Sequence, residues 1–192
     1  MTADPIEALA ADEVLGPVVD EHGSVTIEPA EDLYERLVVS LIRQQVSMAA
    51  AASIRERLFE RVEVTPEAMI EADHAVLHDA GLSEAKADYV KSAASAFRTR
   101  GWDRETFADM SDDAVRAELT DIHGVGPWTA DMFLMFGLGR EDVFPVGDLG
   151  IRKGMDRLFD ADMTRAEMTD AAERWLPYRS YASLYLWRAV EG

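Results

Sequence analysis

Residues 119–150 constrain this chain most, because they place a glycine-rich turn directly before an apolar helix and an isolated carboxylate after it. The turn Gly124–Pro127 reads Gly-Val-Gly-Pro. Glycine allows backbone angles and close approaches that other residues cannot adopt, and proline suits the first position of a helix. Open amides at a helix N-terminus form a seat for phosphate. Asp148 follows where the apolar helix expected over residues 129–138 has ended. A phosphate seat and one acid on a rigid frame suit an enzyme that acts on DNA.

The remainder of the chain has the periodicity of amphipathic helices. Apolar residues recur at three- and four-residue spacing over residues 33–41, 54–62 and 89–97, which favours helix over strand. Gly81 and Gly101 fit as helix stops. Helix starts are indicated at four polar residues, Thr65, Ser83, Ser111 and Thr164. We therefore predict an all-α fold of about ten to twelve helices joined by short loops, without a convincing strand.

Length and composition bound the fold and the compartment. A chain of 192 residues, 48% of them hydrophobic, can bury a full core as one domain or as two closely joined lobes. Its apolar runs are much shorter than a membrane span, and its first residues lack a signal sequence, so a cytoplasmic protein is expected. Because the chain has no cysteine, disulfides, thiolate zinc sites and iron–sulfur clusters are excluded.

The net charge of −18 is unusual for a protein that would bind DNA. Taken alone, it favours an ordinary acidic protein that never meets DNA. The 19 basic residues include only three lysines, Lys86, Lys91 and Lys153. An acidic surplus with scarce lysine resembles the proteins of salt-accumulating cells, where molar salt shortens the Debye length to about 3 Å. A halophilic setting is therefore expected.

Basic residues nevertheless gather in three stretches, at residues 43–61, 86–104 and 152–157. Each stretch by itself is equally well interpreted as a solvated helix face. Three of them in so acidic a chain predict a locally positive strip that would face a polyanion.

Further motifs accompany the hairpin segment 119–130 and the Gly/Pro loop with its acid, residues 144–148. Residues 41–47 read Leu-Ile-Arg-Gln-Gln-Val-Ser, and residues 81–87 read Gly-Leu-Ser-Glu-Ala-Lys-Ala. Residues 172–187 contain Ala-Glu-Arg-Trp and Pro-Tyr-Arg-Ser-Tyr-Ala. In this order the motifs resemble the helix-hairpin-helix (HhH-GPD) DNA glycosylase superfamily, and within it the DNA-3-methyladenine glycosylase II family. The resemblance extends over most of the chain.

The resemblance implies a two-lobed all-α HhH-GPD glycosylase fold with the active-site cleft between the lobes. Residues 1–192 are expected to form a single catalytic unit without the N-terminal β domain of the larger bacterial enzyme. The four-cysteine C-terminus of cluster-bearing members is missing, so no iron–sulfur cluster is expected. Trp128 stands where bifunctional members carry a lysine nucleophile. Because a lyase needs that amine to form a Schiff base, the resemblance implies a glycosylase without lyase activity.

Asp148 is the expected catalytic residue. A carboxylate beside C1′ of the sugar stabilises an oxocarbenium-like transition state or orients the attacking water. An alkylated purine is already a cationic leaving group, so it requires no strong general acid. The alternative is that Asp148 only caps the helix that follows it.

Trp128, Trp187 and Met132 are expected in the pocket for the flipped base, because they match pocket positions of the family. Aromatic faces stack better on a cationic purine than on a neutral one. Core packing is the alternative for each tryptophan, and it is the favoured interpretation for Trp102 and Trp175. The family often has an aromatic residue at the position of Met132.

The hairpin is expected to hold the DNA backbone. The amides of Gly124, Val125 and Gly126 would bind a phosphate. By resemblance, the backbone carbonyls of Thr120, Ile122 and Val125 would bind a monovalent cation, Na or K, that bridges to this phosphate. The alternative is a tight helix–helix turn that meets no DNA.

Gln45 lies where the family places the residue that enters the duplex and fills the space left by the flipped base. Its alternative role is a hydrogen bond to a neighbouring helix end. Arg43, close beside it, is a candidate phosphate contact or else a solvent-exposed side chain.

The resemblance as a whole implies a monofunctional DNA glycosylase of base excision repair. Such an enzyme flips an alkylated purine such as 3-methyladenine out of damaged double-stranded DNA and hydrolyses its glycosidic bond, leaving an abasic site. A same-fold glycosylase for hypoxanthine, uracil or an etheno adduct is one alternative, and a non-catalytic DNA-binding hairpin protein is another. We expect a monomer with no catalytic cofactor and no membrane partner.

Overall fold

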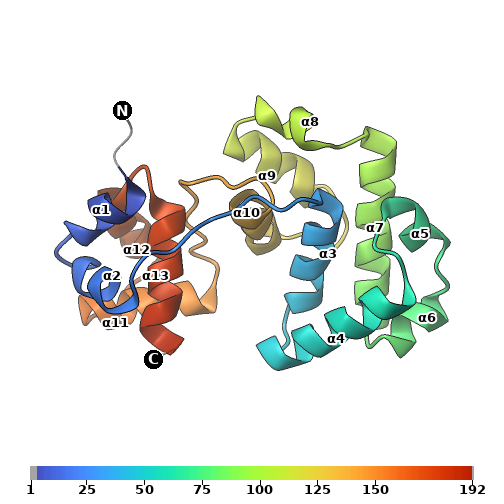
Figure 1. Ribbon diagram of the computed structural model, residues 1–192, viewed down its shortest axis with the longest axis horizontal. Helices are drawn as coiled ribbons and strands as arrows, with labels where there is room; N and C mark the ends of the chain where they lie inside the picture. Colours follow the sequence, from blue (N-terminus) through green and yellow to red (C-terminus); the bar gives the residue numbers. More distant parts are fainter. Residues whose placement is uncertain (1–3, 192) are drawn as a thin grey trace. The chain divides into compact units, whose positions relative to one another are not determined.

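The computed structural model describes residues 4–191, which are helical and contain no strand (Figure 1). The predicted all-α fold is confirmed. The described helices are α1 (Pro5–Ala10), α2 (Gly16–His22), α3 (Leu33–Arg43), α4 (Met48–Arg61), α5 (Pro66–Glu71), α6 (His74–Asp79), α7 (Glu84–Arg100), α8 (Arg104–Ala108), α9 (Asp112–Thr120), α10 (Pro127–Phe136), α11 (Leu149–Phe159), α12 (Arg165–Ala172), the 3-10 helix η1 (Glu173–Trp175) and α13 (Arg179–Glu191).

Side-chain caps explain where several helices begin. At Thr65, Ser83, Ser111 and Thr164 the side-chain oxygen accepts a hydrogen bond from the amide three residues further on. This bond satisfies one of the donors that the first turn of a helix leaves open. All four starts predicted from the sequence are confirmed. Gly101 ends α7 in the left-handed conformation, with φ 62°, as expected of a helix stop.

The chain folds as two compact units, each with its own core. The first unit consists of the residues up to Pro29 together with the residues from Gly139 onward. It is therefore assembled from two separate stretches of chain. The second unit is the single stretch Ala30–Leu138.

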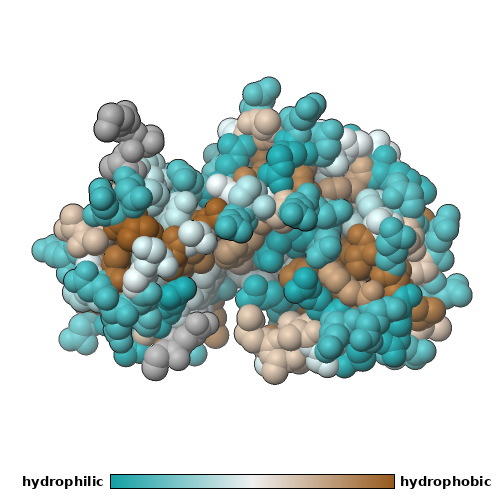
Figure 2. All heavy atoms as spheres, in the orientation of Figure 1, coloured by the Kyte–Doolittle hydropathy of each residue, from teal (hydrophilic) through white to brown (hydrophobic). Residues whose placement is uncertain are grey.

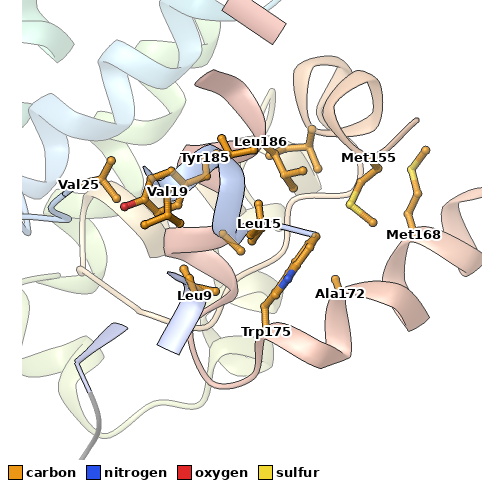
Figure 3. Close-up of a cluster of buried hydrophobic side chains, with 13 residues drawn as sticks. Leu9, Leu15, Val19, Val25, Met155, Met168, Ala172, Trp175, Tyr185 and Leu186 are labelled. Carbon is orange, nitrogen blue, oxygen red and sulfur yellow. The ribbon is translucent and has the colours of Figure 1, made fainter. Parts of the chain in front are cut away.

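The first unit is built around the pair α11 and α13, which pack closely together. Its buried cluster includes Leu15, Trp175 and Tyr185 (Figure 3). Trp175 is 2% exposed, so the expected core position of this tryptophan is confirmed. A Cβ at Gly154 would lie 2.7 Å from the carbonyl oxygen of Leu186. Only glycine therefore allows α11 and α13 to approach this closely.

The second unit is centred on α3, which packs against both α7 and α10, and α9 packs against α10. Phe133 of α10 lies at the middle of this core, where its ring meets those of Phe97 and Phe107 edge-on at centroid distances of 6.4 and 5.4 Å. The hydroxyl of Tyr34 donates to the carbonyl of Val90 at 2.9 Å. This bond ties α3 to α7.

One face of the molecule is mostly polar. Hydrophilic side chains cover most of the visible face (Figure 2), in keeping with the net charge of −18. Across the described part of the chain, every helix is too short or too polar to cross a membrane.

Candidate active site and nucleic-acid interface

Asp148 lies in the first unit and caps α11. Its Oδ1 accepts a hydrogen bond from the backbone N–H of Ile151 at 3.0 Å, and its backbone, with φ −72° and ψ 133°, is extended. The capping role considered for Asp148 is therefore confirmed. Capping is compatible with catalysis, because it fixes the half-buried carboxylate at the positive end of a helix dipole.

A second donor holds the same oxygen of Asp148. Trp187, on α13, donates its Nε1–H to Oδ1 at 2.8 Å. N–H groups from two packed helices therefore set the orientation of one carboxylate. Trp187 is half-buried, and its indole N–H is used by Asp148. The predicted role of its ring in a base pocket stays a prediction.

Gly150 is a residue of this site that the sequence analysis missed. A Cβ there would lie 2.7 Å from Cδ1 of Trp187 and 3.1 Å from Oδ1 of Asp148. A side chain would therefore press on both members of the hydrogen-bonded pair. The available signal was a glycine in the first turn of a helix, two residues after the acid, where glycine disfavours the helix and so indicates a close approach.

The hairpin lies in the second unit, where the turn 121–126 joins α9 to α10. Gly124 has φ 89°, and a Cβ there would lie 2.1 Å from Cγ of Tyr89. Gly126 caps α10 with φ −97°, and a Cβ on it would meet nothing within 4 Å. The turn therefore packs closely on Tyr89 at one position and leaves open space beside the start of α10, as a phosphate seat requires.

An ion pair braces the two helices of the hairpin. Nε of Arg116, on α9, donates to Oδ1 of Asp131, on α10, at 2.8 Å. Burial raises the pKa of Asp131 above its ordinary value, although Arg116 acts in the opposite direction. The brace joins residues on either side of the turn and so links the two helices of the hairpin.

The carbonyl groups expected to hold a cation lie in or beside this turn. The oxygen of Ile122 accepts from the N–H of Val125 at 3.0 Å, and the hydroxyl of Thr120 donates to the carbonyl of Arg116 at 2.7 Å. Backbone carbonyls are ligands suited to Na or K. The cation itself stays a prediction.

Trp128 and Met132 lie one turn apart on α10 and share one face of that helix. Trp128 is half-buried, so it has surface left for a ligand. Met132 is enclosed by the protein, with 1% of its surface exposed. The predicted pocket roles of both residues stay predictions, and the structure favours Trp128 over Met132 as a direct contact.

The junction between α3 and α4 carries the residues expected to contact DNA. Gln45 is exposed and has φ 56°, a left-handed conformation that costs a non-glycine residue about 1–2 kcal/mol. Its neighbour Gln44 donates its side-chain N–H groups to the carbonyl of Gly124 at 3.0 Å and to the hydroxyl of Thr129 at 2.8 Å. Arg43 is half-buried and donates to the sulfur of Met48 at 3.1 Å.

The contact to a neighbouring helix end, considered as an alternative for Gln45, is thus made by Gln44. The sequence analysis did not separate the two glutamines. Gln44 and Gln45 are adjacent at the end of a predicted helix, so their side chains point in different directions. This was the only signal in the sequence that the two glutamines have different roles.

Several of the clustered basic residues serve the fold. Arg57 donates to the carbonyl of Ala80 at 2.9 Å. Arg100 forms ion pairs with Glu118 and Asp121, each at 2.5 Å. Side chains that are held in this way contribute less to a positive surface strip than their number in the sequence implies.

The second unit contains a helix-hairpin-helix, in which the glycine turn 121–126 joins α9 to α10. The first unit contains a candidate catalytic carboxylate, Asp148, which is hydrogen-bonded at the start of α11. Together these features define the class of protein: a helix-hairpin-helix protein with a candidate catalytic acid. Residues 38–178 match the family model described as HhH-GPD superfamily base excision DNA repair protein, and the chain belongs to that superfamily. The superfamily expected from the sequence is therefore confirmed.

Relatives of similar sequence are named as DNA-3-methyladenine glycosylases. A Bacillus subtilis (strain 168) protein whose name assigns it to these enzymes is 31% identical over 92% of this chain and 66% of its own length. DNA-3-methyladenine glycosylase 1 of Schizosaccharomyces pombe is 32% identical over 81% of this chain and 71% of its own length. The chain thus spans slightly less than two thirds of the Bacillus relative.

A solved structure agrees with these sequence relatives. The 3-methyladenine DNA glycosylase of Schizosaccharomyces pombe in complex with abasic DNA has a TM-score of 0.91 at 28% identity, covering 99% of this chain and 98% of that one.

Proposed function

We propose that the protein is a monofunctional DNA glycosylase that excises alkylated purines such as 3-methyladenine. The observation that carries the proposal is the carboxylate of Asp148, held at the start of α11 by the N–H groups of Ile151 and Trp187. Membership of the base excision DNA repair superfamily and the names of the relatives support the same reaction.

In the proposed reaction, the bond between C1′ and the base nitrogen breaks and its electron pair leaves with the base. An alkylated purine carries a positive charge, so it leaves as a neutral molecule without prior protonation. The carboxylate of Asp148 stabilises the positive charge that develops on the sugar. A water molecule then adds to C1′ and loses a proton, which leaves an abasic site.

The pocket for the flipped base is proposed to use aromatic surface. Trp128 would stack on the cationic purine, and Trp187 would contribute ring surface while its N–H holds Asp148. Met132 would pack behind the ring of Trp128 as part of the core, because it lies one helical turn further along α10 and is buried.

The hairpin is proposed to bind damaged double-stranded DNA through its backbone. Amides of Gly124, Val125 and Gly126 would contact one phosphate. The carbonyls of Thr120, Ile122 and Val125 would hold a Na or K ion, which supplies a positive charge beside that phosphate. The relative solved with abasic DNA supports this partner.

Two residues at the junction of α3 and α4 complete the DNA contact. Gln45 would enter the duplex where the base has left, and Arg43 would contact a second phosphate. We propose that the protein acts as a monomer in the cytoplasm.

A lesion panel tests the proposed chemistry. Duplexes carrying methylated purines, hypoxanthine, uracil or ethenoadenine are incubated with the protein in molar KCl. We expect methylated purines to be released fastest, and the product strand to stay intact until hot alkali cleaves it, because Trp128 offers no amine for a Schiff base. Borohydride should trap no adduct.

Each other outcome of the panel selects an alternative. Preferred release of uracil, hypoxanthine or ethenoadenine indicates a same-fold glycosylase for that lesion. Duplex binding without any release indicates a DNA-binding hairpin protein. An adduct trapped at Lys86, Lys91 or Lys153 contradicts the absence of lyase activity.

As the salt concentration rises, the rate of excision is expected first to increase and then to decrease. At 0.01 M salt the Debye length is about 30 Å, so the net charge of −18 repels the duplex and the surface carboxylates repel one another. Counterion release acts in the opposite direction and favours binding at low salt for every basic contact. Because the proposed DNA contact of the hairpin uses amides and a bound cation instead of lysines, we expect repulsion to dominate at low salt concentration.

Single-turnover excision measured from about 0.05 to 3 M KCl should therefore rise to a maximum well above physiological ionic strength. Circular dichroism at each salt concentration separates folding from activity. A steady decline from the lowest salt, in a protein that is folded throughout, would show that the acidic surface is no adaptation to salt.

A further inference from the structure

The ammonium group of Lys86 is held by two backbone carbonyls. Lys86 lies in the first turn of α7, and Nζ donates to the carbonyl of Ile42 at 2.5 Å and to that of Gln44 at 2.7 Å. The side chain is half-buried, and burial lowers its pKa. The proposed chemistry makes no use of it.

These two carbonyls lie where α3 ends. The last carbonyls of a helix have no partner within the helix and carry the negative end of its dipole. A cation at this position therefore caps α3. The second contact extends beyond the helix, because Gln44 is the first residue after it.

The capped segment leads directly into Gln45. The peptide group whose oxygen Lys86 holds is the one that joins Gln44 to Gln45, and Gln45 has φ 56°. A non-glycine residue keeps such a conformation only where its surroundings enforce it. On the other side, Ser47 caps α4 by accepting from the N–H of Ala50.

Gln44 is also held by its side chain, which donates to Gly124 and Thr129 of the hairpin. Lys86 thus holds the main-chain carbonyl of Gln44, and the side chain of Gln44 is hydrogen-bonded to the turn that is proposed to bind phosphate. The segment that follows is exposed: Val46 is 38% exposed and Met48 65%, and apolar side chains gather at the start of α4 (Figure 2).

We infer that Lys86 is a positioning residue for DNA recognition, which locks the junction of α3 and α4 onto the hairpin and thereby presents Gln45 to the duplex. The inference rests on the proposed function, since it assigns Lys86 a role in the same DNA contact. It also gives a physical role to the Gly81–Ala87 motif, which positions Lys86 at the start of α7.

Lys91 provides a matched control. It lies on the same helix and is also half-buried, and its Nζ donates to the carbonyls of Ile70 at 2.9 Å and Ala72 at 2.5 Å. These carbonyls belong to α5 and its end, so Lys91→Met removes the same number of contacts from a helix other than α3.

The test compares Lys86→Met, Lys91→Met and Lys86→Arg by single-turnover excision and by anisotropy with an abasic duplex, in molar KCl. Lost hydrogen bonds to charged groups weaken an interaction by about ten- to a hundredfold. We expect Lys86→Met to weaken duplex binding about tenfold. Lys91→Met should stay within about twofold, and Lys86→Arg, which keeps the positive charge and N–H donors in a different shape, should recover part of the affinity.

A double-mutant cycle with Gln45→Ala tests whether Lys86 affects DNA binding through Gln45. If Lys86 acts through Gln45, the double variant should bind no more weakly than Gln45→Ala alone, whereas a general loss of stability would make the effects add. A 2-aminopurine placed beside the lesion should lose its unstacking signal in both single variants.

The outcomes separate the two proposals. Equal binding by Lys86→Met and Lys91→Met, or additive effects in the cycle, overturns the role of Lys86 while the wild-type protein still excises. Failure of the wild-type protein to release any lesion overturns the proposed glycosylase. The anisotropy measurement on the abasic duplex still tests Lys86 in that case.

Discussion

Replacing Asp148 by Asn should lower single-turnover excision by at least about a hundredfold, which corresponds to about 2.7 kcal/mol of transition-state stabilisation. The amide keeps an oxygen that can accept from Ile151 and Trp187 but carries no charge to stabilise an oxocarbenium-like sugar. Because asparagine is as good a helix cap as aspartate, the fold and the affinity for duplex DNA should survive.

Asp4→Asn is the matched control for Asp148→Asn. Asp4 caps α1 by accepting from the N–H of Ile6 at 2.8 Å, and it belongs to the same unit. The Asp4→Asn substitution should leave the rate of excision unchanged within about twofold, since it alters only the cap of a surface helix. Near-normal turnover by Asp148→Asn, in a protein as stable as the control, would remove Asp148 from the chemistry.

Two glycines of the hairpin should differ in how alanine affects the stability of the fold. At Gly124, the added Cβ would lie 2.1 Å from Cγ of Tyr89, in a backbone with φ 89°. Overpacking costs about 1–3 kcal/mol and a left-handed alanine about 1–2 kcal/mol more. Gly124→Ala should therefore lower the free energy of unfolding by about 2–5 kcal/mol and weaken DNA binding with it.

Gly126→Ala should leave the fold nearly unchanged, by less than about 0.5 kcal/mol, because the new Cβ meets open space and φ is −97°. The same Cβ would enter the space proposed for phosphate, so duplex affinity should fall several-fold. Urea unfolding and fluorescence anisotropy measure the two effects separately. Wild-type affinity in Gly126→Ala would show that no phosphate approaches this turn.

Features that depend on neighbouring residues could be predicted from the sequence. Four helix starts followed from single polar side chains that bond to an amide three residues on. Asp148 was recognised both as a cap and as a candidate acid, and the Gly124–Pro127 turn was recognised by its glycines and proline. In contrast, α1 and α2 are short and have no long apolar period, so the periodicity did not indicate them.

Contacts between distant parts of the chain could not be predicted in the same way. Trp187 meets Asp148 across 39 positions, because a glycine brings α11 close to α13. Gln44 meets Gly124 across 80 positions. Tryptophan and glutamine side chains suit several roles, and only the packing of the helices selects one. The sequence therefore indicated Trp187 as a candidate site residue but not its hydrogen bond, and it indicated Gln45 without Gln44.

The division of the first unit into two stretches has a consequence for biosynthesis. Residues 30–138 form a unit from one uninterrupted stretch, and domains generally fold as units while the chain emerges from the ribosome. The flanking unit must wait for the segments beyond Gly139, and Trp187 belongs to its last described helix. A nascent chain would thus complete the proposed phosphate seat before Asp148 gains the hydrogen bond from Trp187, so that the proposed catalytic carboxylate reaches its final orientation later than the proposed DNA contact.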